Sequence, residues 1–208
     1  MNILPATPEN AIHTSRIRTG RLELVPASLA ILASDLRDRT MLARLLDATV
    51  PPAWPPPLLD TETLAEFVRM KTEKTDPLFV SWYWVLVDPA TKTRTLVGSG
   101  GIASFATEKD TVILGYSVLD EFQNRGYATE AIRGMVPVIF SLPGIRKIMA
   151  TTYPHLKPSI RVLEKTGFAC TGACPGGEGL EEGTLAFILE KPSSPGKTEM
   201  DAVITQRS

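Results

Sequence analysis

The chain has 208 residues, of which 43% are hydrophobic and 22% are charged. This length suits one well-buried domain and is short for two. The 22 basic and 23 acidic residues leave a formal net charge of -1, which argues against a nucleic-acid surface built on bulk charge. Any recognition of an anion therefore has to be local.

Signals for export, membrane insertion or metal binding are not evident in the pattern. Residues 1–11 contain Glu9 and lack the apolar core of a signal peptide, and no stretch approaches the roughly 20 consecutive apolar residues of a membrane span. Cys170 and Cys174 have no second pair to complete a disulfide framework or a metal site. We expect a cytoplasmic protein with reduced thiols, no membrane or nucleic-acid partner and no metal.

The first third of the chain predicts one strand and two helices. Apolar alternation predicts a strand over 21–26, and leucines at helical spacing predict a helix over 28–46. A second helix is predicted over 60–74. The proline-rich segment 51–57 lies between the two helices and should be extended and stiff, because proline disrupts a helix interior. It carries Trp54.

Three strands are predicted next. Apolar runs over 79–87 and 95–105 flank the turn 88–91, and the nearly continuous apolar run 111–118 forms the third strand. Trp82 and Trp84 share one face of the first of these strands. Together with Trp54 they either line a groove for an acceptor or pack in the core, since aromatic residues at alternate strand positions serve both purposes.

The rest of the chain continues the alternation of helices and strands. Pro137 falls inside the first predicted helix and should bend it or end it early. Gly167 stands where a helix C-terminus favours glycine. The predicted elements are a helix over 128–140, a strand over 147–152, a helix over 159–165 and strands over 168–171 and 184–189. The tail 191–208, rich in polar residues, reads as a mobile extension.

The junction between the strand 111–118 and the helix at 128 has the features of an anion cradle. Gly126 permits close approach of a ligand or a positive φ. The first N–H groups of the following helix have no partner within the helix and point toward whatever lies beyond its end. Arg125 adds a positive charge. The loop lacks the lysine of a P-loop and the three glycines of a dinucleotide fingerprint.

Three ordered motifs give the chain a family resemblance. Gly115-Tyr116 is followed by the Q-x-x-G-x-A pattern of 123–128 and then by S-x-R-V-L-E-K-x-G-F over 159–168. In this order they resemble the GNAT N-acetyltransferase superfamily, and within it the ribosomal-protein-acetyltransferase-like (RimJ/RimL-like) branch. The resemblance covers most of residues 18–189.

This resemblance implies a fold and a domain organisation. The fold is α+β, with a mixed and mostly antiparallel twisted sheet of about seven strands, helices on both faces and one splayed parallel strand pair. The splayed pair should be 111–118 and 147–152. We expect an N-terminal extension over 1–17, a single domain over 18–190 and the tail over 191–208.

The resemblance also implies acetyl-CoA as donor and an amine as acceptor. The backbone near residues 116–118 would pair with the pantetheine arm, the Val118 N–H would stabilise the oxyanion, and the loop would wrap the pyrophosphate. Ser159 would donate to the thioester sulfur, unless it only caps its helix. The expected cofactor-binding residues are Tyr116, Ser117, Val118, Gln123, Asn124, Arg125, Gly126, Tyr127, Ala128, Thr129 and Ser159.

The chain departs from the family pattern at one residue that usually bonds to the pantetheine and at two that usually do acid–base chemistry. Leu156 replaces an asparagine, Leu163 replaces a tyrosine acid, and Ile113 replaces a carboxylate. Glu108 or Asp110, acting through water, and His155, as a relay, are the remaining candidates, although ordinary surface roles explain all three.

A weak base favours an acceptor that is nearly neutral already. At pH 7 a lysine amine is about 4.6 kcal/mol from its neutral form and an α-amine only about 1.4 kcal/mol. The leading hypothesis is therefore an acetyl-CoA-dependent N-acetyltransferase acting on a protein N-terminal α-amine, as a monomer or homodimer. A small-molecule amine acceptor, such as an antibiotic or polyamine, and a noncatalytic acyl-CoA-binding module stay open as alternatives.

Overall fold

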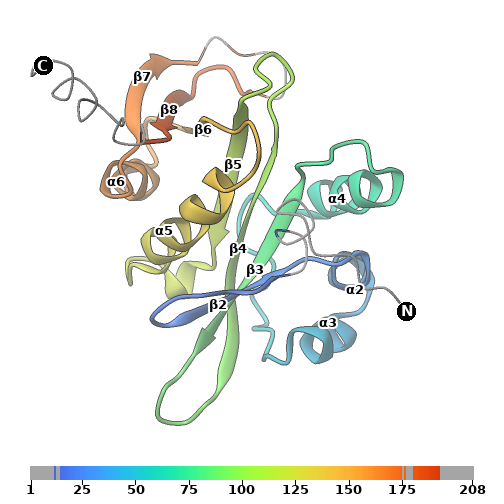
Figure 1. Cartoon of the computed structure of the whole chain (residues 1–208). Coiled ribbons are helices and arrows are strands. Elements are labelled where there is room, and N and C mark those ends of the chain that lie inside the picture. The colour runs from blue at the N-terminus through green and yellow to red at the C-terminus, as the bar shows by residue number, and fades with distance from the viewer. Residues whose placement is uncertain (1–11, 13–14, 175, 177–179, 193–208) are drawn as a thin grey trace, which may run out of the picture.

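The computed structural model describes residues 12, 15–174, 176 and 180–192. These residues form one eight-stranded sheet with helices on both faces (Figure 1). The strand order is β1-β2-β3-β4-β5-β6-β8-β7. Most of the predicted N-terminal extension and all but two residues of the predicted tail lie outside the described residues. No helix in the described part is long and apolar enough to cross a membrane.

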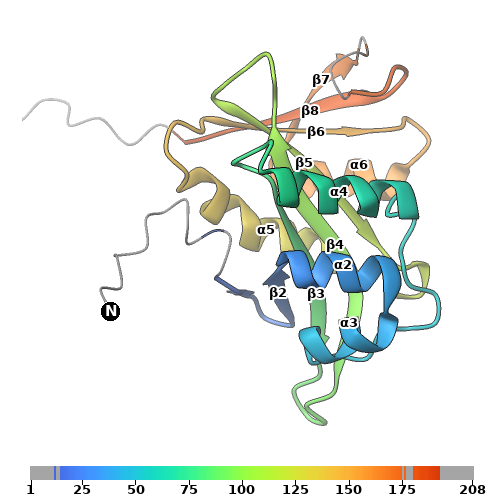
Figure 2. The ribbon, with the colours of Figure 1, turned by 90° about the vertical axis from the view of Figure 1, so that its right-hand side faces the viewer.

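All neighbouring strands are antiparallel except β5 and β6, which are parallel. The sheet is strongly twisted, so that β6, β8 and β7 cross the direction of β3 and β4 (Figure 2). The strands are β1 (Ile17–Arg18), β2 (Leu22–Pro26), β3 (Val80–Val87), β4 (Arg94–Ser104), β5 (Thr111–Val118), β6 (Lys147–Thr152), β7 (Ala169–Ala173) and β8 (Leu185–Glu190). The predicted α+β class is confirmed, with β1 as an additional edge strand.

The helices divide between the two faces of the sheet. Figure 2 shows α2, α3 and α4 in front of the sheet and α5 and α6 behind it. They are α2 (Leu29–Arg37), α3 (Arg39–Leu46), α4 (Thr61–Glu73), α5 (Tyr127–Phe140) and α6 (Lys157–Lys165), with a 3-10 turn η1 (Asp120–Phe122) before α5.

The two faces of β3 belong to two hydrophobic clusters, which explains why this strand is apolar throughout except at Ser81. Trp82 and Trp84 are wholly buried in the cluster beneath α5. Tyr83 belongs to the opposite cluster, where it packs against Trp54. The three tryptophans are therefore core residues on opposite faces of the sheet, which confirms core packing over the groove as the outcome of the two alternatives.

Two details of the predicted helices are also corrected. The helix expected over 28–46 is broken at Asp38, which has extended dihedrals and caps the start of α3 by accepting a hydrogen bond from the Met41 N–H (2.9 Å). Leucine spacing continues across this break and hides it. Pro137 lies inside α5, yet the helix continues to Phe140 instead of ending early.

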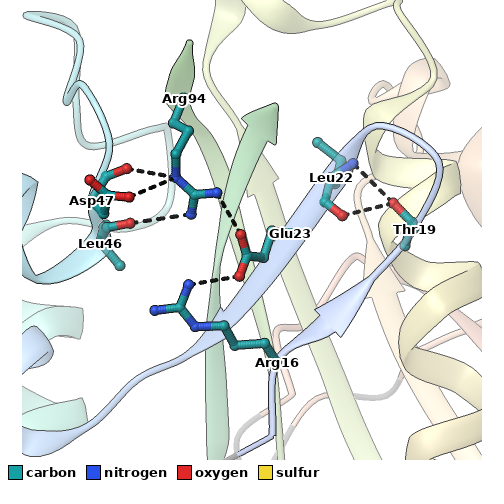
Figure 3. Close-up of polar contacts among 7 residues, drawn as sticks. All are labelled: Arg16, Thr19, Leu22, Glu23, Leu46, Asp47 and Arg94. Atoms are coloured by element: carbon teal, nitrogen blue, oxygen red, sulfur yellow. Dashed lines mark hydrogen bonds and ion pairs between the residues drawn. The ribbon is translucent and has the colours of Figure 1, made fainter. Parts of the chain in front are cut away.

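A buried carboxylate ties β2 to β4 and to the end of α3 (Figure 3). Glu23 in β2 accepts hydrogen bonds from Arg16 Nη1 (2.7 Å) and Arg94 Nη1 (2.6 Å). Arg94 in β4 also donates from Nε to the Asp47 carbonyl (2.7 Å) and lies 3.5 Å from the Asp47 carboxylate. Asp47 is the C-cap of α3, so this network fixes the helical layer to the sheet.

Candidate functional site

The parallel strands β5 and β6 separate after a short stretch of pairing. The register of the described strands joins Thr111–Ile113 to Lys147–Met149 and goes no further. β5 continues to Val118, and β6 continues to Thr152 while pairing with β8 on its other side. The second half of β5 thus has one edge bonded to β4 and one edge that faces a gap.

The backbone groups that face this gap follow from the antiparallel alternation of β4 and β5. The Leu119 N–H donates to Val97 O (3.0 Å), and the Phe105 N–H donates to Thr111 O (3.3 Å). Odd-numbered residues of β5 therefore bond to β4, and even-numbered residues point their N–H and C=O groups into the gap. Of the predicted pantetheine-binding backbone, Tyr116 and Val118 face the gap and Ser117 faces β4.

The loop after β5 shapes the start of α5. Gly126 is the N-cap of α5 and has a φ of 81°, the left-handed conformation that favours glycine. Glu130 N–H donates to Gly126 O (3.0 Å) as the first helical bond of α5, and no side chain in the described part of the chain caps the helix. The N–H groups of Tyr127, Ala128 and Thr129 are consequently available to an anion.

Within the loop, Asn124 also has a positive φ, of 60°. Gln123 turns its side chain inward and donates from Nε2 to Val118 O (3.0 Å) and to the Asp120 carboxylate (2.8 Å). This side chain closes the η1 turn and uses up the Val118 carbonyl, so Val118 offers the gap its N–H alone. The Tyr127 side chain is buried beneath the loop.

Two arginines lie at the loop, and the sequence indicated only one of them. The Arg125 guanidinium lies 5.6 Å over the Phe122 ring. Arg21, from the β1–β2 turn, donates from Nη1 to the Arg125 carbonyl (3.1 Å) and lies 4.6 Å over the Tyr127 ring. Because Arg21 is about a hundred residues away in sequence, no local pattern links it to the loop.

Glu130 holds Arg21 in place. Its carboxylate accepts hydrogen bonds from Thr19 Oγ1 (2.6 Å), the Arg21 N–H (2.6 Å) and Arg21 Nε (2.7 Å). Burial alone would raise the pKa of Glu130, but these hydrogen bonds and the charge of Arg21 outweigh burial and lower it. The expected helix-dipole charge is thus also an anchor for the β1–β2 turn.

A hollow of about 660 Å³ borders Gly126 on this side of α5. Its lining includes four cationic side chains, two of which are held by neighbouring groups. Arg133 donates from Nη2 to the Lys165 carbonyl (2.9 Å). The four are Arg18, Arg21, Arg133 and Lys165. The loop therefore lies at the edge of a positively charged surface.

Ser159 and Tyr116 meet across the gap. Their hydroxyl oxygens lie 2.9 Å apart, and Tyr116 Oη lies 3.3 Å from the Ser159 carbonyl oxygen, a second acceptor for the one phenolic hydrogen. α6 begins at Lys157, with Leu156 as its N-cap. Ser159 is the third residue of the helix, so the alternative that it caps α6 is wrong.

Leu163, which stands where other family members have a tyrosine, is a core residue. It is wholly buried, and its carbonyl accepts from the Phe168 N–H (3.0 Å) while the Gly167 N–H donates to Glu164 O (3.1 Å). These two bonds, with Gly167 at a φ of 92°, form a Schellman motif. The predicted glycine stop of this helix is confirmed.

The remote acid–base candidates lie elsewhere. Glu108 pairs with Lys147 (3.2 Å) where β5 and β6 begin, roughly 20 Å from Val118 at 3.3 Å per residue. Neither it nor Asp110 can serve the gap. His155 is exposed and stacks on Tyr153 with ring centroids 5.4 Å apart.

A second hollow, of about 680 Å³, lies beyond the end of β5. One wall is the proline-rich segment from Ala53 to Asp60, and the other is Leu119–Glu121. Ser117 Oγ donates to the Pro57 carbonyl, and Trp54 anchors the segment by donating from Nε1 to the Asp35 carboxylate (2.7 Å). This side of the gap therefore opens into a hollow whose proline-rich wall is held in place by hydrogen bonds.

The splayed parallel pair is the feature that the sequence resemblance implied, and a family model agrees with that resemblance. The acetyltransferase (GNAT) domain model matches residues 21–169. The chain belongs to the GNAT acetyltransferase family, as the three motifs predicted.

Comparisons with individual proteins show further similarities. The chain is 26% identical over 115 residues to the uncharacterized N-acetyltransferase YoaA of Bacillus subtilis (strain 168); the match covers 55% of this chain and 59% of YoaA, less than two thirds of it. Mycobacterium smegmatis RimJ in complex with CoA-disulfide superimposes with a TM-score of 0.56 at 19% identity, covering 85% of this chain and 86% of RimJ.

A ribosomal-protein-S5-alanine acetyltransferase from Vibrio fischeri gives a TM-score of 0.52 at 19% identity, covering 86% of this chain and all of that one (100%). At these identities the likeness shows the fold alone. The predicted likeness to RimJ/RimL-type ribosomal-protein acetyltransferases is confirmed at that level.

Proposed function

We propose that this protein is an acetyl-CoA-dependent N-acetyltransferase that transfers the acetyl group directly to an amine. The observation that carries the proposal is the unpaired edge of β5, which ends at an uncapped helix start. A pantetheine arm contains amide groups. The Tyr116 N–H and C=O groups are placed to pair with those amides as they would with a neighbouring strand.

The phosphates of CoA would occupy the loop. The N–H groups of Tyr127, Ala128 and Thr129 point at an anion at the start of α5, and the helix dipole favours negative charge there. Arg125 supplies a charge directly, and the positively charged hollow beside Gly126 offers further partners for the phosphates of the nucleotide half.

The acetyl group would then lie near Val118 and Ser159. The Val118 N–H is the last gap-facing donor of β5 and is placed to stabilise the oxyanion that forms when an amine attacks the thioester. The Ser159 hydroxyl is placed to donate a hydrogen bond to the sulfur as negative charge develops on it. Most of the rate increase would come from holding amine and thioester together.

The acceptor that best fits this site is a protein N-terminal α-amine. The carboxylates that line the hollow at the Val118 end of the gap are Asp60, Asp120 and Glu121, and all three are exposed. None of these three is a buried base. An α-amine needs only about 1.4 kcal/mol to become neutral at pH 7, against about 4.6 kcal/mol for lysine.

RimL and the Vibrio fischeri protein, which share this fold, carry names that describe ribosomal-protein acetyltransferases, which supports the same choice. The hollow beyond β5 is the proposed entrance for the acceptor, because its Leu119–Glu121 wall continues directly from Val118.

The experiment measures CoA release from acetyl-CoA with a panel of peptides that have free or blocked N-termini and with small amines. Release with free N-termini alone supports the proposal. Release with small amines alone assigns a small-molecule acceptor, and tight CoA binding without release for any acceptor assigns a noncatalytic module.

Arg125→Ala tests the cradle directly. Loss of one phosphate contact to a charged group should weaken CoA binding by about tenfold in calorimetry. Lys92→Ala, in the distant β3–β4 turn, is the matched control and should leave the affinity unchanged. Equal affinities of wild type and Arg125→Ala would contradict the assignment of the loop.

A further inference from the structure

The Tyr116 phenol has no part in the function proposed so far. It nevertheless contacts the Ser159 hydroxyl, the one side-chain hydroxyl to which that function gives a role. Tyr116 comes from β5 and Ser159 from α6, on the two sides of the gap. Their hydroxyl oxygens are 2.9 Å apart, and the phenol also reaches the Ser159 carbonyl (3.3 Å). The phenol therefore contacts Ser159 at two points.

The position of the phenol is fixed from behind. The Tyr116 ring stacks on the wholly buried Trp84, with ring centroids 6.4 Å apart and planes inclined by 19°. Gly100 in β4 makes this possible, because a Cβ there would lie 2.6 Å from Trp84 Cζ2 and 3.1 Å from Tyr116 Cβ. The Trp84 indole packs over Gly100 and against the Tyr116 ring. Residues of β3, β4 and β5 therefore fix the position of the Tyr116 hydroxyl.

The phenol also remains a donor throughout the neutral range. Burial raises the pKa of Tyr116 to about 12, and the hydrogen bond with Ser159 offsets only part of this increase. A serine hydroxyl has one hydrogen and two acceptor positions. The phenol has one hydrogen, and Ser159 Oγ at 2.9 Å is the nearer of its two acceptors. When the phenol donates there, the serine hydrogen is left free for another partner.

We propose that Tyr116 is a positioning residue for Ser159: it donates to Ser159 Oγ and so directs the serine hydrogen into the gap, toward the sulfur of CoA. This inference rests on the proposed CoA site. Tyr116 keeps its own proton in this role, and no bond is made or broken at the phenol.

The test uses the thiol of bound CoA and needs no acceptor. A hydrogen bond to sulfur stabilises the thiolate, so it lowers the pH at which bound CoA ionises, which thiolate absorbance reports. Tyr116→Phe should move this titration midpoint upward, equivalent to about a fivefold loss of thiolate at a given pH. Ser159→Ala should move it at least as far.

The double variant separates positioning from a general structural effect. If Tyr116 acts through Ser159, then Tyr116→Phe has no further effect in the Ser159→Ala background. Tyr83→Phe is the control: Tyr83 is a buried tyrosine on the opposite face of the sheet, and its hydroxyl donates to the Asp35 carboxylate (2.6 Å). It should leave the midpoint unchanged. Calorimetry should show CoA affinities within about twofold of wild type for Tyr116→Phe.

Each other outcome is decisive. If Ser159→Ala shifts the midpoint and Tyr116→Phe does not, or if the two shifts add, the positioning role is overturned and the proposed function stands. If Ser159→Ala leaves the midpoint unchanged while CoA still binds, Ser159 does not contact the sulfur and the inference falls. If the wild-type protein does not bind CoA, the proposed function fails first.

Discussion

Glu23 offers the most direct test of how the sheet and its helical layer are held together (Figure 3). Its side chain is 7% exposed, and Glu23→Gln would leave the Arg94 guanidinium, 20% exposed, with the longer contact to the exposed Asp47 carboxylate (3.5 Å) as its remaining ion pair among the described residues. Breaking one side of a buried pair costs about 3 kcal/mol, whereas the more exposed contact with Arg16, 44% exposed, adds less than about 1 kcal/mol. We expect the free energy of unfolding to fall by about 3 kcal/mol and the Tm by about 6 to 12 °C.

The stability difference between wild type and Glu23→Gln should depend on pH in a defined direction. Burial raises the pKa of Glu23, but the hydrogen bonds from Arg16 and Arg94 outweigh it and hold the pKa below its ordinary value of 4.5. A depressed folded pKa means that the stabilisation is present above the unfolded pKa and is lost as the pH falls through the folded one. The Tm gap between wild type and Glu23→Gln should therefore be full near neutral pH and shrink in acid.

The measurement is thermal unfolding followed by circular dichroism, once near neutral pH and once in acid. Glu62→Gln, a carboxylate at the exposed first turn of α4, is the matched control and should change stability by no more than about 0.5 kcal/mol. A Glu23→Gln protein that melts within about 2 °C of wild type near neutral pH, or a gap of equal size in acid, would refute the reasoning.

Two glycines give further predictions. Gly126→Ala places a side chain at a φ of 81°, which costs about 1 kcal/mol and should weaken CoA binding about fivefold in calorimetry. The new Cβ contacts only Arg21 Nη2, at 3.5 Å. Unchanged binding would therefore mean that backbone strain at residue 126 is irrelevant to the ligand. Gly100→Ala drives a Cβ to 2.6 Å from Trp84 and should cost about 1 to 3 kcal/mol in urea unfolding. Adding Trp84→Phe should recover part of that loss, and purely additive losses would argue against the contact.

Local chemistry made several parts of the structure predictable from sequence. The strand expected over 111–118 and the one expected over 147–152 have those bounds in the structure. Both are short apolar runs between clear turn signals. Gly126 and Gly167 were placed correctly because a loop-to-helix junction and a helix stop each require a conformation that glycine adopts at little cost.

The misplaced boundaries had weaker signals that were nevertheless present. Asp38 interrupts the leucine pattern as an N-cap residue, a type that favours the start of a new helix. Pro158 lies in the first turn of α6, where proline is favoured, and it indicated a start before Ser159. In both cases apolar periodicity was allowed to outweigh a capping residue.

The contacts that define the site could not be predicted in this way. Arg21 and Glu130 are 109 residues apart, and Tyr116 and Ser159 are 43 apart. Hydrophobic patterning states which face of an element is buried, but it contains no information on which polar side chains meet across two elements. The same limit applied to Trp54 in the proline-rich segment, whose partner Asp35 comes from α2.

The position of Leu163 explains why a hydroxyl pair is found at the gap. The side chain at 163 is wholly buried and its carbonyl takes part in the Schellman motif that ends α6, so this position cannot present a phenol to the gap without loss of core packing. Ser159, one turn earlier on the helix, is only half-buried and contacts a phenol that β5 supplies from the other side. A short serine hydroxyl gains a defined direction when a rigid donor occupies one of its acceptor positions. The chain thus has a tyrosine at the gap after all, held by the sheet instead of by the helix, and acting on Ser159 instead of on the substrate.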